Sequence, residues 1–232
     1  MIPDRVAAVL ERIAGAAARA SRPPEAVTLV AVSKTFPPQA VRSAFEAGLR
    51  HFGENRVQEA EAKIAALAGL RDRGLCWHLV GHLQSNKARR ATTLFDVIQS
   101  LDSLDLAERL ARLAAEAGRR VRALLQVDLA GETAKFGLPE SEAPAALARM
   151  RALGELRVEG LMTMPPFHDD PEEVRPYFRR LRGLRDRMAA EGLLDGGELS
   201  MGMSHDFEAA VEEGATIVRV GTAIFGEREA AA

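Results

Sequence analysis

TLVAVSKT, residues 28–35, is a short apolar run that stops at a serine and a lysine. Such a run predicts a buried strand, with Lys34 at its end. Only four of the 31 basic residues are lysines, and a lysine amine is nucleophilic at neutral pH only where desolvation or a nearby cation lowers its pKa. Lys34 is therefore a candidate for forming an imine with an aldehyde. The alternative is a solvated ammonium group on an apolar stem, held in a salt bridge.

Similar runs alternate along the chain with segments that repeat apolar residues every three or four positions. The expected strands are 28–33, 50–53, 77–81, 97–100, 121–128, 157–162, 198–201 and 217–220. The expected helices are 38–47, 57–68, 86–93, 103–117, 141–153, 171–191 and 207–213, with another at 4–20 ahead of the first strand. Eight such units favour an α/β fold, a single (β/α)8 TIM barrel with an extra N-terminal helix, over an open doubly wound sheet. We expect one domain over residues 1–232, with the helix within 1–25 and the barrel within 28–226.

The composition excludes several classes of protein. A net charge of −2 gives no general attraction to nucleic acid or to an anionic membrane. The single cysteine, Cys76, excludes an internal disulfide, and the N-terminus lacks the pattern of a signal peptide. No apolar stretch approaches the ~20 residues that span a bilayer. We expect a soluble, cytoplasmic monomer that binds neither nucleic acid nor membrane.

Polar and glycine-rich motifs follow the expected strands. In a (β/α)8 barrel, functional residues gather at the carboxyl ends of the strands, so these motifs predict a site on one rim. The motifs are Lys34, GEN (53–55), GHLQSNK (81–87), KFG (135–137), MTMP (162–165), GMS (202–204) and RVGT (219–222).

The last two motifs predict a binding site for a phosphate. Ser204 lies near the start of an expected helix, where free backbone N–H groups and the helix dipole favour an anion. Gly221 and Thr222 follow the last strand, and loops after strands seven and eight form phosphate sites in this fold. Alternatively, Ser204 or Asp206 is only the residue that caps the helix. Acidic residues in the first turn would also repel a phosphate placed too close.

Arg219 lies inside the apolar run IVRVG, where alternation places it on the face opposite Val218 and Val220. That face is the barrel interior, where a guanidinium needs a partner. The partner is either a core carboxylate or an acceptor on a ligand. A pyridine ring nitrogen would suit Arg219 and would remain unprotonated, because arginine keeps its charge.

The spacing of the histidines in the sequence does not predict a metal site. His78 and His82 are four residues apart, which in a strand is ~13 Å, so the two rings cannot share one ion. His51 and His168 have no constellation of metal-binding residues around them in the sequence, and we expect both on the surface or in loops. Tyr177, the only tyrosine, lies in an expected helix, where packing or a solvated face accounts for it.

Together the motifs resemble one family, the pyridoxal 5′-phosphate homeostasis proteins. The segments that carry the resemblance are LVAVSKT (29–35), HFGENRVQE (51–59), WHLVGHLQSNK (77–87), GLMTMPP (160–166), MGMSHDFEAAVEEG (201–214) and VRVGTAIFGER (218–228). The resemblance implies a barrel similar to the N-terminal domain of bacterial alanine racemases. It also implies that Lys34 holds pyridoxal 5′-phosphate (PLP) as a Schiff base and that Ser204, Gly221 and Thr222 contact the phosphate. Arg219 would face the pyridine nitrogen, and Asn55 would line the pocket.

By the same resemblance, the protein acts in vitamin B6 balance by storing or delivering PLP, without established turnover. Apo forms of PLP-dependent enzymes are candidate partners. The chain stops soon after the barrel closes, and Tyr177 lies in the wrong kind of segment, so we expect no second acid or base across a bound substrate. The alternatives are a small PLP-dependent racemase or decarboxylase and, in another class, a Schiff-base aldolase acting on phosphorylated sugars.

The chain departs from the family pattern at three places. His82 stands where many members carry proline, Phe36 stands where many carry lysine, and the tail Glu229–Ala232 has no lysine. Any second cofactor site that uses those lysines is in doubt. Lys135 does match a family lysine and is a candidate for transient capture of the cofactor, with a solvated loop lysine as the alternative.

Overall fold

The structure is a computed structural model that describes residues 1–131 and 136–227. Its helices are α1 (Ile2–Arg19), α2 (Pro38–Glu46), α3 (Val57–Ala66), α4 (Ala88–Leu94), α5 (Leu104–Glu116), α6 (Ala143–Met150), α7 (Arg175–Ala190), α8 (Phe207–Glu212) and α9 (Thr222–Phe225). Its strands are β1 (Thr28–Val32), β2 (His51–Glu54), β3 (Cys76–Leu79), β4 (Val97–Leu101), β5 (Val121–Asp128), β6 (Leu138–Pro139), β7 (Leu156–Met162), β8 (Glu198–Ser200) and β9 (Ile217–Val220).

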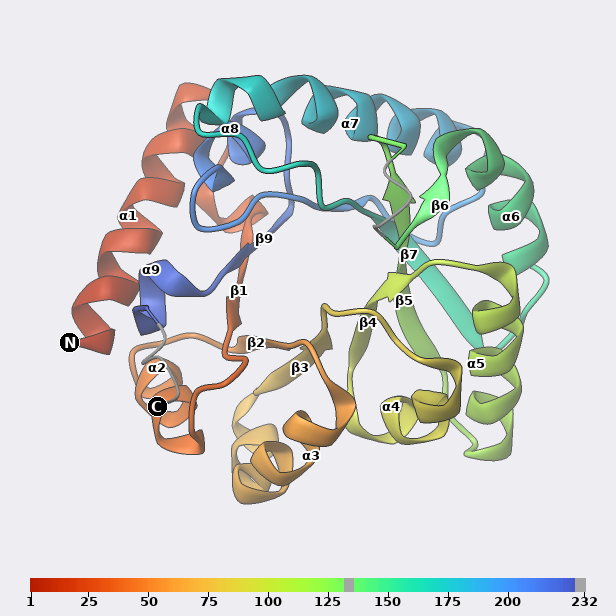
Figure 1. Cartoon of the computed structure of the whole chain (residues 1–232), viewed down its shortest axis with the longest axis horizontal. Coiled ribbons are helices and arrows are strands. Elements are labelled where there is room, and N and C mark those ends of the chain that lie inside the picture. Colours follow the sequence, from red (N-terminus) through yellow and green to blue (C-terminus); the bar gives the residue numbers. More distant parts are fainter. Residues whose placement is uncertain (132–135, 228–232) are drawn as a thin grey trace.

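Eight of these strands form a closed parallel barrel surrounded by helices (Figure 1). The pairing runs from β1 through β2, β3, β4, β5, β7, β8 and β9, and β9 pairs again with β1. The (β/α)8 TIM barrel expected from the sequence is therefore confirmed. The extra N-terminal helix is also present, because α1 packs against α2, α8 and α9 on the outside of the barrel.

Alternation along the strands determines which side chains face the interior. In β1, Leu29 and Ala31 join the large core between strands and helices, while Val30 belongs to a second cluster inside the barrel. In β9, Val218 and Val220 likewise join the outer core, and Arg219 pairs in register with Val30. The alternation predicted for Arg219 thus holds.

The helices form because one face of each is apolar. In α5, Leu106, Leu110 and Leu113 recur at three and four positions and are buried against the sheet. The hydroxyl of Ser103 begins this helix by accepting a hydrogen bond from the N–H of Leu106 at 3.3 Å. Packing of these faces holds the strand ends, and so the loops on the rim, in fixed positions.

Two short elements differ from the expectation. β6 pairs with the end of β5 over only two residues, which is too short to show a pattern in the sequence. α9 begins at Thr222, where the sequence suggested only a loop. Among the residues that the structure describes, none of the helices combines the length and apolarity needed to cross a membrane.

Candidate functional site

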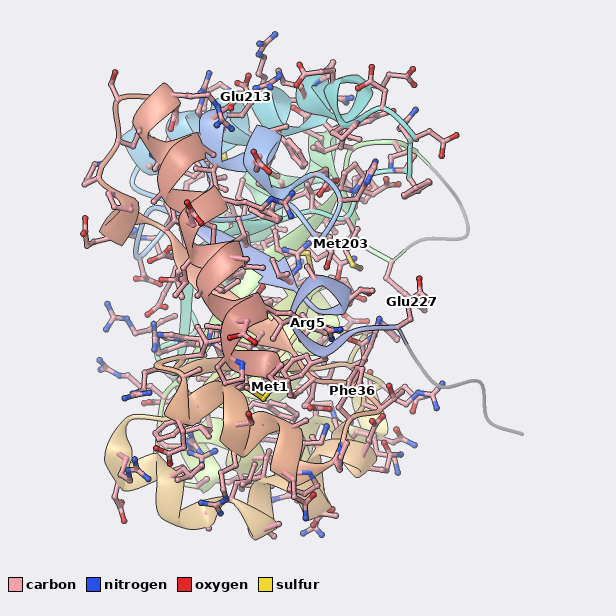
Figure 2. The ribbon with its side chains drawn as sticks, turned by 90° about the vertical axis from the view of Figure 1, so that its left-hand side faces the viewer. Met1, Arg5, Phe36, Met203, Glu213 and Glu227 are labelled. Carbon is pink, nitrogen blue, oxygen red and sulfur yellow. The ribbon has the colours of Figure 1, made fainter. Side chains whose placement is uncertain are left out.

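Lys34 lies two residues beyond the last residue of β1 and is half-buried. The turn that carries it is closed by a 3.1 Å hydrogen bond from the N–H of Phe36 to the carbonyl of Ser33. Thr35 has a φ of +69°, and its N–H donates to the Glu59 carboxylate. A β-branched residue rarely adopts this conformation, so the turn is strained and is held by its partners. Phe36 and Met203 lie on the same side of the molecule, so the loops after β1 and β8 share one rim (Figure 2).

A buried ion pair lies directly behind this turn. Lys63 Nζ is 2.5 Å from Glu54 Oε1 and donates at 2.7 Å to the carbonyl oxygen of Ser33. The Ser33 hydroxyl donates to the same Glu54 oxygen at 2.6 Å. Burial raises the pKa of Glu54, and the Lys63 charge opposes that rise. The sequence marked Lys63 only as a rare lysine, because its partner lies on a different element.

Ser204 and the loop after β9 come together as the sequence suggested. Ser204 Oγ accepts hydrogen bonds from the N–H groups of Gly221, at 3.2 Å, and Ala223, at 3.5 Å. Asp206, rather than Ser204, is the N-cap residue of α8, and its carboxylate accepts from the N–H of Met203 at 2.6 Å. The Ser204 hydroxyl is therefore joined to the Gly221 loop, where the fold places its phosphate sites.

Arg219 is 4% exposed and points into the barrel. Its guanidinium donates to Ser200 Oγ at 2.5 Å and to the Thr163 carbonyl at 2.9 Å, both of them neutral oxygens. Burial lowers the pKa of Arg219 to about 10, and the charge of Asp206 partly offsets this. Within residues 1–131 and 136–227 the core carboxylate considered from the sequence does not form an ion pair with Arg219. The guanidinium still carries its proton at neutral pH.

A chain of hydrogen bonds leads from Arg219 across the barrel interior. Ser200 Oγ donates to Gln99 Oε1 at 2.6 Å, and Gln99 Nε2 lies 2.9 Å from His78 Nδ1. The sequence did not identify Ser200 or Gln99. The available signal was a polar residue inside each of two short apolar strands, which favours a polar interior.

An open pocket of about 770 Å³ lies beside the rim. Asn55 lines it, together with Gly81 and His82. A Cβ atom on Gly81 would lie 2.3 Å from the carbonyl oxygen of Asn55, so only glycine allows the two loops to approach this closely. His82 stacks on Phe136 with 3.6 Å between ring centroids, and its Nδ1 lies 2.9 Å from Asp102.

The expectation for His51 is wrong. His51 begins β2, is half-buried, and its Nδ1 lies 3.0 Å from His78 Nε2, because parallel pairing places the starts of β2 and β3 side by side. His78 and His82 have different partners, as expected from their spacing. His168 lies in a loop and contacts Glu173, and Tyr177 packs on the core from α7. Lys135 and the tail 229–232 lie outside the described residues.

Comparison with known proteins identifies the family. The sequence matches the family described as "Alanine racemase, N-terminal domain" over residues 5–229. A pyridoxal phosphate homeostasis protein of Aquifex aeolicus is 43% identical over 226 residues, which cover 97% of this chain and 98% of that protein. This chain belongs to the pyridoxal phosphate homeostasis protein family. The family expected from the sequence is confirmed.

Solved structures extend the comparison. PipY from Synechococcus elongatus PCC7942, whose structure has been solved with PLP bound, is 44% identical to this chain. The TM-score is 0.85, and the match covers 97% of this chain and 100% of PipY. An alanine racemase of Clostridium difficile 630 is 16% identical, with a TM-score of 0.71 over 98% of this chain and 58% of the racemase. The second likeness shows the fold alone.

Proposed function

We propose that this protein binds PLP at the carboxyl-terminal rim and holds it for storage or delivery. Lys34 would anchor the aldehyde as a Schiff base, and Ser204, Gly221 and Thr222 would hold the phosphate. Arg219 would face the pyridine nitrogen, and Asn55 would line the pocket. The observation that carries this proposal is Arg219, a buried cation whose hydrogen bonds within the described chain go to neutral oxygens. A ligand with a neutral acceptor suits that site.

The residues present fit the three parts of PLP. Ser204 and Gly221 are joined at one end of the rim, and Lys34 follows the strand that pairs with β9. A Cβ atom on Gly221 would lie 3.2 Å from the carbonyl of Val32, so this loop runs close to the strand that ends next to Lys34. PipY, 44% identical, has been solved with PLP bound, which supports the same ligand here.

The covalent step needs no further reagent. A neutral Lys34 amine adds to the aldehyde carbon, the C=N bond forms, and the aldehyde oxygen leaves as water. When bound, PLP supplies the aldehyde and an electron-withdrawing ring. Arg219 keeps its proton at neutral pH and so offers a donor to the ring nitrogen rather than a proton acceptor.

The proposed role is binding without turnover. Relatives that match nearly their whole length are named homeostasis proteins rather than enzymes. Apo forms of PLP-dependent enzymes are the proposed recipients, and we propose that the protein works as a monomer in the cytoplasm. A PLP-dependent racemase or decarboxylase would need an acid or base poised across the substrate, and Tyr177 packs on the core from α7 instead.

Incubation of the PLP-loaded protein with a panel of L- and D-amino acids in deuterated water tests this role. We expect no sustained exchange of the α-proton, measured by NMR, and no change of enantiomer. An alanine racemase, which has the same barrel fold, is the matched positive control for this exchange. Sustained exchange at catalytic rates that disappears in Lys34→Ala would contradict the carrier function.

A further inference from the structure

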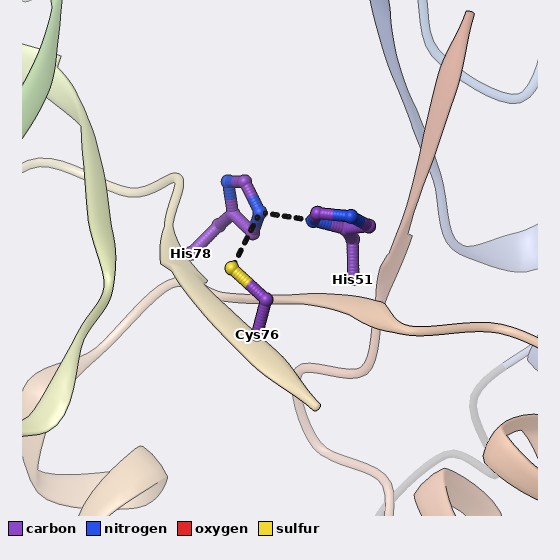
Figure 3. A group of neighbouring side chains, drawn as sticks. All are labelled: His51, Cys76 and His78. Carbon is purple, nitrogen blue, oxygen red and sulfur yellow. Dashed lines mark hydrogen bonds between the residues drawn. The ribbon is translucent and has the colours of Figure 1, made fainter. Parts of the chain in front are cut away.

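Three side chains that bind metals well in other proteins meet at the amino-terminal mouth of the barrel, at the opposite end of the strands from Lys34. His51 begins β2 and Cys76 begins β3, and the two residues are partners in the parallel register. Phe52 and Trp77 turn outward and pack on each other with 6.0 Å between ring centroids. Because side chains alternate along a strand, His51, Cys76 and His78 all turn inward (Figure 3).

The three donor atoms lie close enough together to share one tetrahedral metal ion. His51 Nδ1 is 3.0 Å and Cys76 Sγ is 3.5 Å from His78 Nε2, and the three atoms lie within 4.8 Å of one another. A zinc ion with bonds of about 2.0–2.1 Å to nitrogen and about 2.3 Å to sulfur separates such donors by roughly 3.3–3.6 Å. The two pairs that involve His78 are within a few tenths of an ångström of this spacing, and the His51–Cys76 pair, within 4.8 Å, closes around one ion by rotation of the two side chains.

We propose that His51, Cys76 and His78 form a binding site for a single borderline divalent cation, of which Zn²⁺ is the best match. Imidazole nitrogens and a thiolate select such ions over Mg²⁺ and Ca²⁺, which prefer oxygen ligands. Three protein ligands leave the fourth position of the tetrahedron open to water. On binding, the Cys76 thiol loses its proton to solvent and the sulfur–metal bond forms, with no change of oxidation state.

The surroundings of the three side chains allow an ion to enter and keep the two imidazole rings neutral. His51 and Cys76 are half-buried and reach solvent at the mouth, while His78 lies deeper and is 3% exposed. Burial lowers the pKa of both His51 and His78, so at neutral pH each ring is neutral and has one nitrogen lone pair for the metal. Burial also raises the pKa of Cys76 to about 12, so the thiol stays protonated until an ion displaces the proton.

The neighbour of His78 completes the arrangement. A metal on Nε2 leaves the ring proton on Nδ1, which lies 2.9 Å from the Gln99 amide. The Gln99 amide then presents its oxygen to His78 and its NH2 group to Ser200 Oγ. Ser200 continues to accept from Arg219. Each side chain keeps at least one partner, although the Ser200 hydroxyl no longer donates to Gln99, and the metal site connects to the interior chain that reaches Arg219.

Titration of the PLP-free protein with Co²⁺, under a reductant that lacks a thiol, tests the site. We expect one Co²⁺ per chain, a thiolate-to-cobalt charge-transfer band, and release of about one proton. Zn²⁺ should displace the cobalt and remove the band. Absence of the band, or cobalt bound without proton release, would overturn the proposal.

Matched variants locate the ion. Cys76→Ser should abolish the charge-transfer band, and His51→Gln should weaken binding by at least about tenfold. His82→Gln, a histidine on the opposite rim, should leave the titration unchanged. Circular dichroism checks that each variant is folded. A charge-transfer band that survives in folded Cys76→Ser, or that is lost in folded His82→Gln, would contradict this assignment whatever the protein does with PLP.

Discussion

Lys63 Nζ donates a 2.7 Å hydrogen bond to the carbonyl oxygen of Ser33, the residue directly before Lys34. The same ammonium pairs with Glu54, whose side chain is fully buried. The second Glu54 oxygen is also buried and has no donor among the described residues. A buried ion pair therefore fixes the backbone that presents the candidate anchor.

The two partners of this ion pair should not be equivalent. Glu54→Gln leaves the Lys63 ammonium buried without its carboxylate, and we expect it to lower the free energy of unfolding by about 3 kcal/mol or more. Lys63→Met leaves a carboxyl group that is able to take up a proton, so the loss at mildly acidic pH should be smaller. Urea denaturation of both variants measures the difference. Equal losses in the two variants at mildly acidic pH would show that the unpaired Lys63 charge does not determine the loss of stability.

The stability of Lys63→Met should also depend on pH. The folded-state pKa of Glu54 is raised above the ordinary 4.5, and removing the cation raises it further. Below pH 4.5 the Glu54 carboxyl group carries a proton in both the folded and the unfolded chain. The contribution of this group to the free energy of unfolding is then at its maximum. As pH rises toward the raised value, the unfolded chain loses its proton first and stability falls. Denaturant midpoints of Lys63→Met and of the parent protein between pH 4 and pH 8 measure this loss of stability. A difference between the two midpoints that does not change with pH would contradict the prediction.

Ser204→Ala should weaken the binding of PLP but not of pyridoxal. The substitution removes the hydroxyl that joins the Gly221 loop, and we expect the Kd for PLP to rise by about tenfold. Pyridoxal lacks the phosphate and serves as the matched ligand, since its aldehyde and ring are the same. Equilibrium titration by absorbance gives both constants. An equal loss for both ligands would place Ser204 outside the phosphate site.

Arg219→Met should separate stability from binding. The guanidinium is buried with neutral partners, so a packed apolar side chain should leave stability unchanged within about 1–2 kcal/mol. Affinity for PLP should fall by roughly tenfold to a hundredfold, because the donor to the ring nitrogen is lost. Arg122→Met, which removes an arginine paired with Glu159 on β5 and β7, is the control and should keep its affinity. Large destabilisation with unchanged affinity would make Arg219 structural.

Gly81→Ala should disturb the pocket through the backbone. Its Cβ would lie 2.3 Å from Asn55 O, which belongs to the neighbouring loop, so one loop has to move. We expect a loss of about 1–3 kcal/mol in stability and weaker PLP binding. Gly183→Ala, in α7 with nothing within 4 Å, should instead gain about 0.5–1 kcal/mol. Thermal unfolding compares the two variants, and a neutral Gly81→Ala would disprove the close approach.

Hydrophobic periodicity predicted the barrel because each strand and helix has its own local pattern. Alternation was also enough to place Arg219 in the interior, since Val218 and Val220 on either side are apolar. The resemblance added Asn55, and the structure positions it on the rim.

Contacts between elements were harder to predict. His51 was expected in a loop or at the surface because no constellation of metal-binding residues surrounds it in the sequence, yet the parallel register sets it beside Cys76. Register depends on how neighbouring strands pair, and a shift by one residue turns a side chain to the other face. Lys63 and Glu54 show the same limit, because a helix and a strand have to pack before the two charges meet.

The central claim is that Lys34 is the residue that holds PLP. Protein loaded with PLP is reduced with borohydride, which converts an imine to a stable amine, and the labelled peptide is then mapped by mass spectrometry. We predict a visible imine band that disappears on reduction and a single label on Lys34. The band should be absent in Lys34→Ala and retained in Lys87→Ala, the control lysine on the same rim. A label on another lysine, or protein that stays colourless with PLP, would contradict the account.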